Sequence, residues 1–226
     1  SNDVFQNIQN KIGYSKIILF AIWRIEMNLQ SGKYYWPTTF PDAPSYPALE
    51  ENLCCDVLII GGGSSGAQCA YELADTNLDV VVIEKLTIGS GSTSANTALL
   101  QYSGEKMFIN LVNTFGEDYM ARHLQLLKDA VDTIEAASKN VAIDCEFTRR
   151  DTLYGASCPE DVEKLRKEYE YLKSHNCELD FLSKEEVEAK YPFSRDAAIY
   201  SYNDDEINPF RYTHALIDYE KKKGVR

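Results

Sequence analysis

The sequence has no excess of basic residues and no hydrophobic run long enough to cross a membrane. Its 226 residues include 35 acidic side chains against 23 basic ones, which gives a net charge of −12. That charge argues against nucleic acid or an anionic membrane surface as a partner. The longest apolar run near the N-terminus, residues 17–23, is too short for a bilayer span, and no targeting segment is evident. We therefore expect a cytoplasmic protein with no membrane span.

Patterns typical of a metal site or of a hydrolytic nucleophile are also missing. The six cysteines are scattered without a C-x-x-C pair, so we interpret them as reduced thiols. The three histidines are too dispersed for a metal site, and we expect each on a helix surface. We interpret the run Asp204–Glu206 as an acidic turn and Arg149-Arg150 as a solvated strand end. Three candidate nucleophiles have no histidine and acid partners at a readable spacing: Ser92, Ser94 and Cys69.

What the sequence does contain is enough apolar material for a core, preceded by a proline-rich segment. Residues 34–49 hold most of the seven prolines, which favours an extended path. The segment is either a ligand for a proline-recognising domain or a strap against its own protein. We favour the strap because its aromatic side chains would be costly to leave in water. These aromatics are Tyr34, Tyr35, Trp36 and Phe40.

A β-α-β pattern follows the proline-rich segment. Residues 56–60 and 78–85 are apolar runs typical of strands buried on both faces, and residues 64–75 between them have helical spacing. The order predicts two parallel strands joined by a right-handed crossover. Further helices are predicted at 117–138, 159–175 and 208–224, the last with Asn208 as its cap, and strands at 146–157 and 197–207.

The turn between the first strand and its helix has the spacing G-x-G-x-x-G. Gly61 permits a tight turn, Gly63 a close approach to a pyrophosphate, and Gly66 close packing of helix on strand. Glu84 ends the next strand, where an acid can accept hydrogen bonds from ribose hydroxyls and would repel a 2′-phosphate. A turn that merely joins strand to helix is the alternative. We predict a dinucleotide site, for FAD or NAD.

The segment after that acid is rich in small hydroxyl residues. With the motifs "IIGGGSSG" and "INPFRYTHAL", the stretch "GSGSTSANTALL" resembles FAD-dependent oxidoreductases of the D-amino acid oxidase and glycine oxidase family over residues 55–226. The family often has glycine where this chain has Thr97-Ala98, and we expect Ala98-Leu99-Leu100 to be buried. The resemblance implies these cofactor-binding residues: Gly61, Gly63, Ser64, Ser65, Gly66, Glu84, Lys85, Ser92, Thr93, Ala98 and Leu99.

The resemblance implies an α/β fold in which a partial Rossmann-type FAD-binding domain is interleaved with the start of an α+β substrate domain. The expected parts are an N-terminal strap (1–52), the first part of the FAD-binding domain (53–140), the first part of the substrate domain (141–206), and a return to the FAD-binding domain (207–226). A third parallel strand is expected to begin at the final residues.

The implied chemistry is hydride transfer to FAD from the carbon that bears an amine, giving an imine that hydrolyses. The expected partner is a small amine or amino acid. We expect the catalytic residues in a missing second half, and we name none here. We further expect the 226-residue piece to bind FAD weakly or not at all, to show no oxidase turnover, and to need that half, or self-association, for stability. The alternatives are an NAD-dependent dehydrogenase and a non-catalytic dinucleotide-binding fragment.

Overall fold

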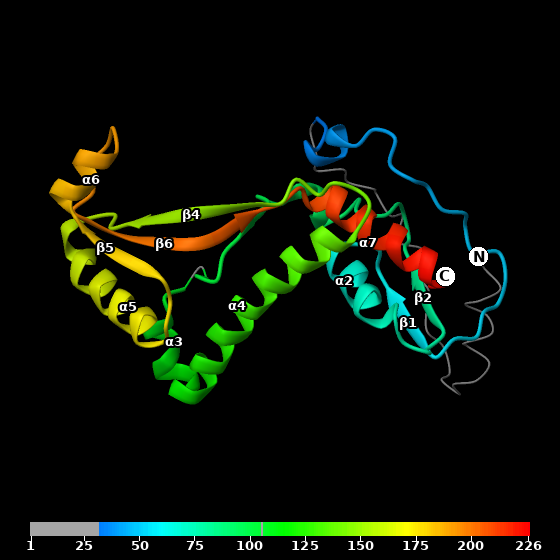
Figure 1. Ribbon diagram of the computed structural model, residues 1–226, viewed down its shortest axis with the longest axis horizontal. Coiled ribbons are helices and arrows are strands. Elements are labelled where there is room, and N and C mark those ends of the chain that lie inside the picture. The colour runs from blue at the N-terminus through cyan, green and yellow to red at the C-terminus, as the bar shows by residue number, and fades with distance from the viewer. Residues whose placement is uncertain (1–31, 105) are drawn as a thin grey trace, which may run out of the picture. The chain divides into compact units, whose positions relative to one another are not determined.

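The computed structural model describes residues 32–104 and 106–226 (Figure 1). The apolar run at residues 17–23 and most of the expected N-terminal strap domain therefore lie outside the described residues. The chain divides into residues 1–33 and a compact unit of residues 34–226, and it is the second unit that carries the glycine-rich turn. Of the helices in the described residues, none is both long and apolar enough to traverse a bilayer.

The predicted β-α-β unit is present. Strand β1 (Val57–Ile60) leads into helix α2 (Ser64–Leu73), and strand β2 (Val80–Ile83) pairs with β1 in parallel, with Val57 opposite Val80. The expectation of strands buried on both faces is wrong for β1. Its residues alternate, and Leu58 and Ile60 are exposed at 50% and 80%. One face of this strand therefore remains open to solvent.

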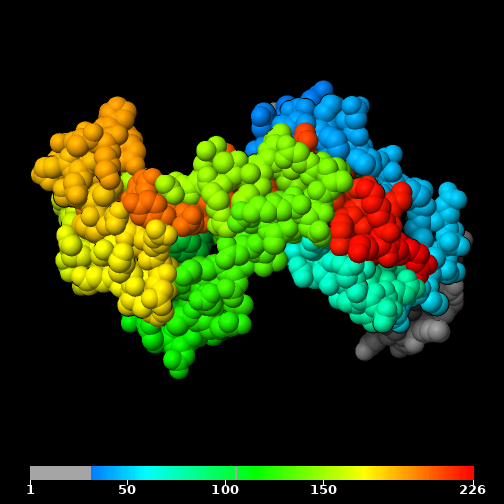
Figure 2. Space-filling model, viewed as in Figure 1, coloured from blue at the N-terminus to red at the C-terminus, as the bar shows by residue number. Residues whose placement is uncertain are grey.

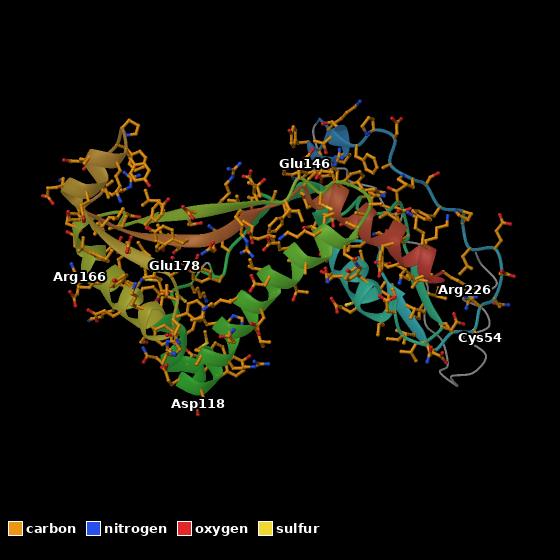
Figure 3. All side chains as sticks on the ribbon, viewed as in Figure 1. Cys54, Asp118, Glu146, Arg166, Glu178 and Arg226 are labelled. Atoms are coloured by element: carbon orange, nitrogen blue, oxygen red, sulfur yellow. The ribbon has the colours of Figure 1, made fainter. Side chains whose placement is uncertain are left out.

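Pairing on the far side of β2 begins at the last residue of the chain. The Arg226 N–H donates to Val80 O at 3.0 Å, and Val82 N–H donates to Arg226 O at 2.8 Å. The Arg226 guanidinium also donates to Cys54 O at 2.8 Å, and the two labelled residues lie at the same end of this sheet (Figure 3). The two backbone bonds of Arg226 amount to one residue of parallel pairing, at the position where the sequence predicts a third strand to begin.

Helix α7 (Pro209–Lys223) packs on α2. The Asn208 side chain accepts a hydrogen bond from Arg211 N–H at 3.1 Å, so it caps the helix as predicted. Gly224 ends the helix in the left-handed conformation at φ 101°. In the space-filling view α7 lies between the strap residues and α2 (Figure 2).

A second, antiparallel sheet has β6 at its centre. The predicted strands 146–157 and 197–207 correspond to β4 (Thr148–Gly155) and β6 (Ala197–Glu206), which pair along most of their length. On the other edge of β6 lie two short strands that the sequence analysis did not predict. They are β3 (Leu99–Leu100), opposite Asp205 and Glu206, and β5 (Leu179–Ser183), opposite residues 197–201.

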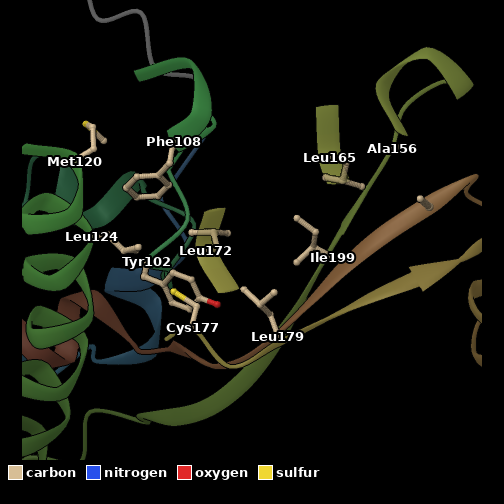
Figure 4. Close-up of a cluster of buried hydrophobic side chains, with 11 residues drawn as sticks. Tyr102, Phe108, Met120, Leu124, Ala156, Leu165, Leu172, Cys177, Leu179 and Ile199 are labelled. Atoms are coloured by element: carbon tan, nitrogen blue, oxygen red, sulfur yellow. The ribbon is translucent and has the colours of Figure 1, made fainter. Parts of the chain in front are cut away.

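Helices cover one face of this sheet around a common core (Figure 4). The predicted helices 117–138 and 159–175 correspond to α4 (Glu117–Asn140) and α5 (Val162–Ser174), the latter preceded by η3 (Pro159–Asp161). Two helices were not predicted, α3 (Phe108–Phe115) and α6 (Lys184–Lys190). The core side chains of this face include Phe108, Met120, Leu124, Leu165, Leu172, Leu179 and Ile199.

The proline-rich strap forms a short 3-10 helix, η1 (Trp36–Thr39), and then runs without regular structure through residue 50. The expectation that its aromatics are all covered is only partly right. Trp36 and Phe40 are half-buried, whereas Tyr34 and Tyr35 are exposed at 38% and 67%. The strap is therefore held by a few side chains along its length.

Candidate functional site

The glycine-rich turn connects β1 to α2 in a backbone path that only glycine permits. Gly61 has a φ of 114°, a conformation that L-residues with a side chain rarely adopt. A Cβ atom on Gly66 would collide with the carbonyl oxygen of Gly61. A Cβ atom on Gly62 would collide with the Ile88 side chain. The turn is therefore drawn tightly against the first turn of α2.

The first turn of α2 presents amide groups that the protein does not use. Ser64 N–H donates to Thr93 Oγ1 at 3.0 Å. The N–H groups of Gly63, Ser65 and Gly66 have no hydrogen-bond acceptor within the described residues. Unpaired amides and the positive end of the helix dipole make such a helix start a ready anion site. The arrangement fits a pyrophosphate.

Glu84 braces the same turn from the end of β2. Its Oε2 accepts a hydrogen bond from Gly62 N–H at 2.8 Å, and its Oε1 accepts one from Leu86 N–H at 3.0 Å. These bonds, that from Gly62 first, hold the pKa of the Glu84 carboxyl below its ordinary value. Each carboxylate oxygen has a further lone pair, so the ionised group can still accept from ribose hydroxyls.

The hydroxyl-rich segment folds back onto the turn. It contains a 3-10 helix, η2 (Ser92–Ala95), whose Thr93 hydroxyl accepts the Ser64 bond described above. Gly89 N–H donates to Gly62 O at 2.9 Å, and Ser94 Oγ donates to Gly89 O at 2.6 Å. The structure thus brings together three parts of the predicted site that are separate in sequence: the glycine turn, Glu84 and Thr93.

The remaining predicted residues lie around this centre without joining its hydrogen bonds. Ser65, Lys85 and Ser92 are exposed. Ala98 is buried and has a φ of 67°, a left-handed conformation usually taken by glycine. Leu99 is 54% exposed, so the expectation that Ala98-Leu99-Leu100 is buried is wrong at its middle residue. The cause is strand alternation, because β3 turns successive side chains to opposite faces.

Two further expectations are wrong for the acidic run and for one histidine. Asp204 and Asp205 lie within β6, each 1% exposed, and not in a turn. Burial raises the pKa of Asp205 to about 6 although Arg149 Nε lies 3.2 Å from its Oδ1. His214 is 2% exposed on the buried face of α7, and burial lowers its pKa. These positions are decided by tertiary packing.

Of the two arginines expected at a solvated strand end, Arg150 is exposed as predicted and Arg149 is half-buried, and both form ion pairs. Arg149 Nη2 donates to Asp132 Oδ1 at 2.8 Å and also bonds Glu135. Arg150 Nη2 donates to Glu206 Oε1 at 2.6 Å. Arg149 therefore links β4 to α4 and β6, whereas Arg150 pairs with β6 alone.

Sequence reasoning missed three residues that shape the site. Gly62 supplies the amide that Glu84 accepts, and Gly89 supplies the contact to the turn. A Cβ on Gly89 would come within 2.9 Å of the Phe210 ring. Asn96 closes the loop, since its Nδ2 donates to Thr93 O at 3.1 Å and its Oδ1 accepts from Ala98 N–H at 2.8 Å. Asn96 had a readable signal, because asparagine commonly forms such local turns.

No group of three or more metal-ligating side chains occurs in the part of the chain that the structure describes. All six cysteines are free thiols, as predicted. The arrangement consists of unpaired amides, a glycine cradle and one ionised carboxylate, which is the set that a dinucleotide requires. It contains no nucleophile with a base beside it.

The sequence of the chain matches a family described as FAD dependent oxidoreductase (DAO) over residues 56–226. Among curated proteins, the chain is 30% identical over 192 residues to YhfW of Bacillus subtilis (strain 168), which is named as a Rieske 2Fe-2S iron-sulfur protein; the match covers 85% of this chain and 37% of that protein. It is 26% identical over 194 residues to gamma-glutamylputrescine oxidoreductase of Escherichia coli (strain K12), covering 85% of this chain and 41% of that protein.

Solved structures share the fold. Glycine oxidase from Geobacillus kaustophilus superposes with a TM-score of 0.57 at 23% identity, over 76% of this chain and 45% of that one. L-alpha-glycerophosphate oxidase from Mycoplasma pneumoniae, with FAD bound, superposes with a TM-score of 0.58 at 21% identity, over 76% of this chain and 44% of that one. The chain thus spans less than half the length of these proteins.

Proposed function

Because the chain belongs to the family of FAD-dependent oxidoreductases, we propose that the intact protein binds FAD at the glycine turn and oxidises a small amine or amino acid. The observation that carries the cofactor site is the meeting of three unpaired amides with the ionised Glu84 on one turn. The family match favours FAD over the NAD alternative, which explains the turn but not the loop that follows it.

In this proposal different residues bind different parts of the cofactor. The amides of Gly63, Ser65 and Gly66 hold the pyrophosphate, and Glu84 accepts from the ribose hydroxyls. Thr93, with the neighbouring Ser92, lines the site from the hydroxyl-rich loop. Ala98 and Leu99 continue that wall towards the antiparallel sheet, and Lys85 and Ser64 complete the set. When bound, FAD supplies a two-electron acceptor for hydride.

The division of the chain follows from the same proposal. We assign residues 53–140 and 207–226 to the FAD-binding domain and residues 141–206 to the start of the substrate domain. Within the first range, β3, α3 and the first half of α4 pack on the antiparallel sheet. The β1–α2–β2 unit and α7, which pack together, support the first assignment. The sheet centred on β6 supports the second. Residues 34–52 then belong to a strap that precedes both.

The choice of an amine donor rests on resemblance and is open to a direct test. The names of glycine oxidase and gamma-glutamylputrescine oxidoreductase each contain a compound with a CH–NH group, whereas the name of glycerophosphate oxidase contains an alcohol. A screen of the intact protein against amino acids, N-methylated amines and glycerol phosphate, read by bleaching of the flavin absorbance, distinguishes them. Bleaching by glycerol phosphate alone would overturn the amine proposal and leave the flavin site standing.

The cofactor proposal is tested by purifying the intact protein and denaturing it. We expect a yellow protein that releases FAD. Apoprotein should then take up FAD, and should not bind NAD in a calorimetric titration. A colourless protein that cannot be reconstituted with FAD contradicts the proposal.

A further inference from the structure

The strap residues Trp36–Thr39 lie outside the stretch that matches the family, yet they contact the loop that lines the proposed FAD site. The 3-10 helix η1 packs against both η2 and α7.

One anchor joins the strap directly to the loop. The indole Nε1–H of Trp36 donates to the carbonyl oxygen of Asn96 at 2.9 Å. These residues are 60 positions apart, so the bond is a tertiary contact and not a turn. Trp36 offers only this donor from its ring, which makes the bond removable by a single conservative substitution.

Asn96 also connects to the glycine turn through Thr93. Its side chain donates to Thr93 O at 3.1 Å, and the Thr93 hydroxyl accepts from Ser64 N–H at 3.0 Å, in the first turn of α2. Three residues thus connect the strap to the amides that hold the pyrophosphate in the proposed site: Asn96, Thr93 and Ser64. The link from Trp36 to α2 runs through three hydrogen bonds and through the covalent structure of Asn96 and Thr93, because each of these two residues uses its backbone carbonyl on one side and its side chain on the other.

A second anchor fixes the strap to the start of α7. The Asn208 side chain, which caps that helix, donates to Thr39 Oγ1 at 2.8 Å. The Phe40 ring packs edge-on against His214 with the centroids 5.8 Å apart, and the Arg211 guanidinium lies 5.4 Å from the Phe40 centroid. With one anchor at each end of η1, the strap is held in a single position over the loop.

We propose that residues 36–40 are a positioning element for the dinucleotide site, holding the loop of residues 89–98 in its binding conformation before the cofactor arrives. This inference rests on the proposed function. Without the strap, a small, hydroxyl-rich loop would lose conformational entropy when FAD binds, and this loss would weaken binding. Because the strap orders the loop during folding, part of this entropy is already lost before FAD binds. The anchors therefore contribute to FAD affinity without touching FAD.

The decisive variant is Trp36→Phe in the intact protein. It keeps an aromatic ring in place and removes the N–H donor. We expect the dissociation constant for FAD, measured by fluorescence titration of the apoprotein, to rise about 3- to 10-fold, the range of a single net hydrogen bond. Amide hydrogen exchange in residues 89–98 of the apoprotein should quicken, and the visible spectrum of the saturated flavoprotein should stay unchanged.

Tyr35→Phe is the matched control. Tyr35 is adjacent and exposed, and the change again removes one polar atom from an aromatic ring. We expect neither the FAD dissociation constant nor the loop exchange to move. Thr39→Val, which removes the hydroxyl at the second anchor, supplies a second measurement with a rise in the same direction should the Trp36 variant fail to fold.

The outcomes separate the two proposals. A wild-type protein that binds FAD, with Trp36→Phe and Thr39→Val binding it equally well, overturns the positioning role and leaves the proposed function intact. A wild-type apoprotein that binds no FAD overturns both. Equal weakening by Tyr35→Phe also overturns the inference, because it would show a general effect of the segment.

Discussion

The Glu84 carboxylate accepts a hydrogen bond from the Gly62 amide at 2.8 Å, across 22 residues of sequence. The bond ties the end of β2 to the turn that follows β1, and the second carboxylate oxygen is held by Leu86 N–H. Glu84 therefore stabilises the turn even without a bound cofactor, in addition to the ribose contact that we propose for it.

The first prediction concerns Glu84→Gln. The amide keeps one acceptor oxygen but turns an NH2 group towards a backbone donor, and it removes the charge that strengthens both bonds. We expect the free energy of unfolding to fall by about 1–3 kcal/mol, and FAD affinity to fall at least tenfold. The loss should shrink as the pH falls. The pKa of Glu84 is lowered in the fold, so its stabilisation exists above the unfolded pKa and disappears below the folded one.

Glu72→Gln is the control for this change. Glu72 lies on the exposed side of α2 and accepts a hydrogen bond from Gln68 at 2.9 Å, within the same helix. Urea unfolding and FAD titration should both leave this variant within error of wild type. If the Glu84 variant also matched wild type in both measurements, the brace would have no energetic role.

The second prediction contrasts two glycines. Gly66→Ala places a methyl group against the Gly61 carbonyl, so the turn must open or the helix must shift. Gly104→Ala is the contrasting change, because Gly104 does not have a positive φ and a Cβ atom there would come no closer than 3.9 Å to another atom, the carbonyl oxygen of Lys106. We expect the first variant to lose FAD binding and about 2 kcal/mol or more of stability, and the second to keep both. Thermal melts and FAD titrations check this, and equal behaviour of the two would contradict the packing argument.

The sequence predicts the local features of this fold well. The β1–α2–β2 unit, the Asn208 cap of α7 and the apolar stripe of α4 were readable because each depends on a spacing or a capping residue within a few positions. Helix α6 had such a signal and was missed. Ser183 accepts from Glu186 N–H at 3.3 Å and Glu186 accepts from Ser183 N–H at 2.7 Å, a capping box written as S-x-x-E.

What the sequence does not predict depends on which elements meet. Asp204 and Asp205 look like a solvated turn until β4 and β3 pair on either side of β6 and bury them. Likewise His214 carries no sign of burial before Phe40 and Phe210 pack around its ring. The sequence predicts a shared role for Glu84, Ser64 and Thr93 in one site, but the hydrogen bonds from Gly62 to Glu84 and from Ser64 to Thr93 follow from the fold alone.

The third prediction is that Ala98→Gly stabilises the protein. Ala98 has a φ of 67°, and a left-handed conformation costs a residue with a Cβ roughly 1–2 kcal/mol relative to glycine. The lost methyl burial offsets about 0.8 kcal/mol of that relief. We expect a net gain of up to about 1 kcal/mol in chemical denaturation. Ala98→Val, which cannot take this conformation easily, should lose stability, and a stabilised valine variant would contradict the account.

The fourth prediction concerns Glu220, whose carboxyl is buried on α7 with no hydrogen-bond partner. Burial raises its pKa to about 8, well above the value of 4.5 for an exposed glutamate. The fold therefore prefers the neutral acid. As far as it depends on Glu220, the free energy of unfolding is highest below the pKa of this carboxyl in the unfolded chain. It declines as the pH rises towards the pKa in the folded protein, by about 1.4 kcal/mol per pH unit between those limits.

Glu220→Gln removes this titration while keeping the shape of the side chain. We expect the difference in unfolding free energy between variant and wild type to shift in favour of the variant as the pH rises from 5 to 8. Asp218→Asn is the control, since Asp218 pairs with Lys222 at 2.7 Å on the outer part of the same helix. Its difference from wild type should change far less over that range. Urea denaturation at four pH values measures both, and a flat difference for Glu220→Gln would show that the carboxyl is ionised within the fold, and so that a counter-charge or water reaches it.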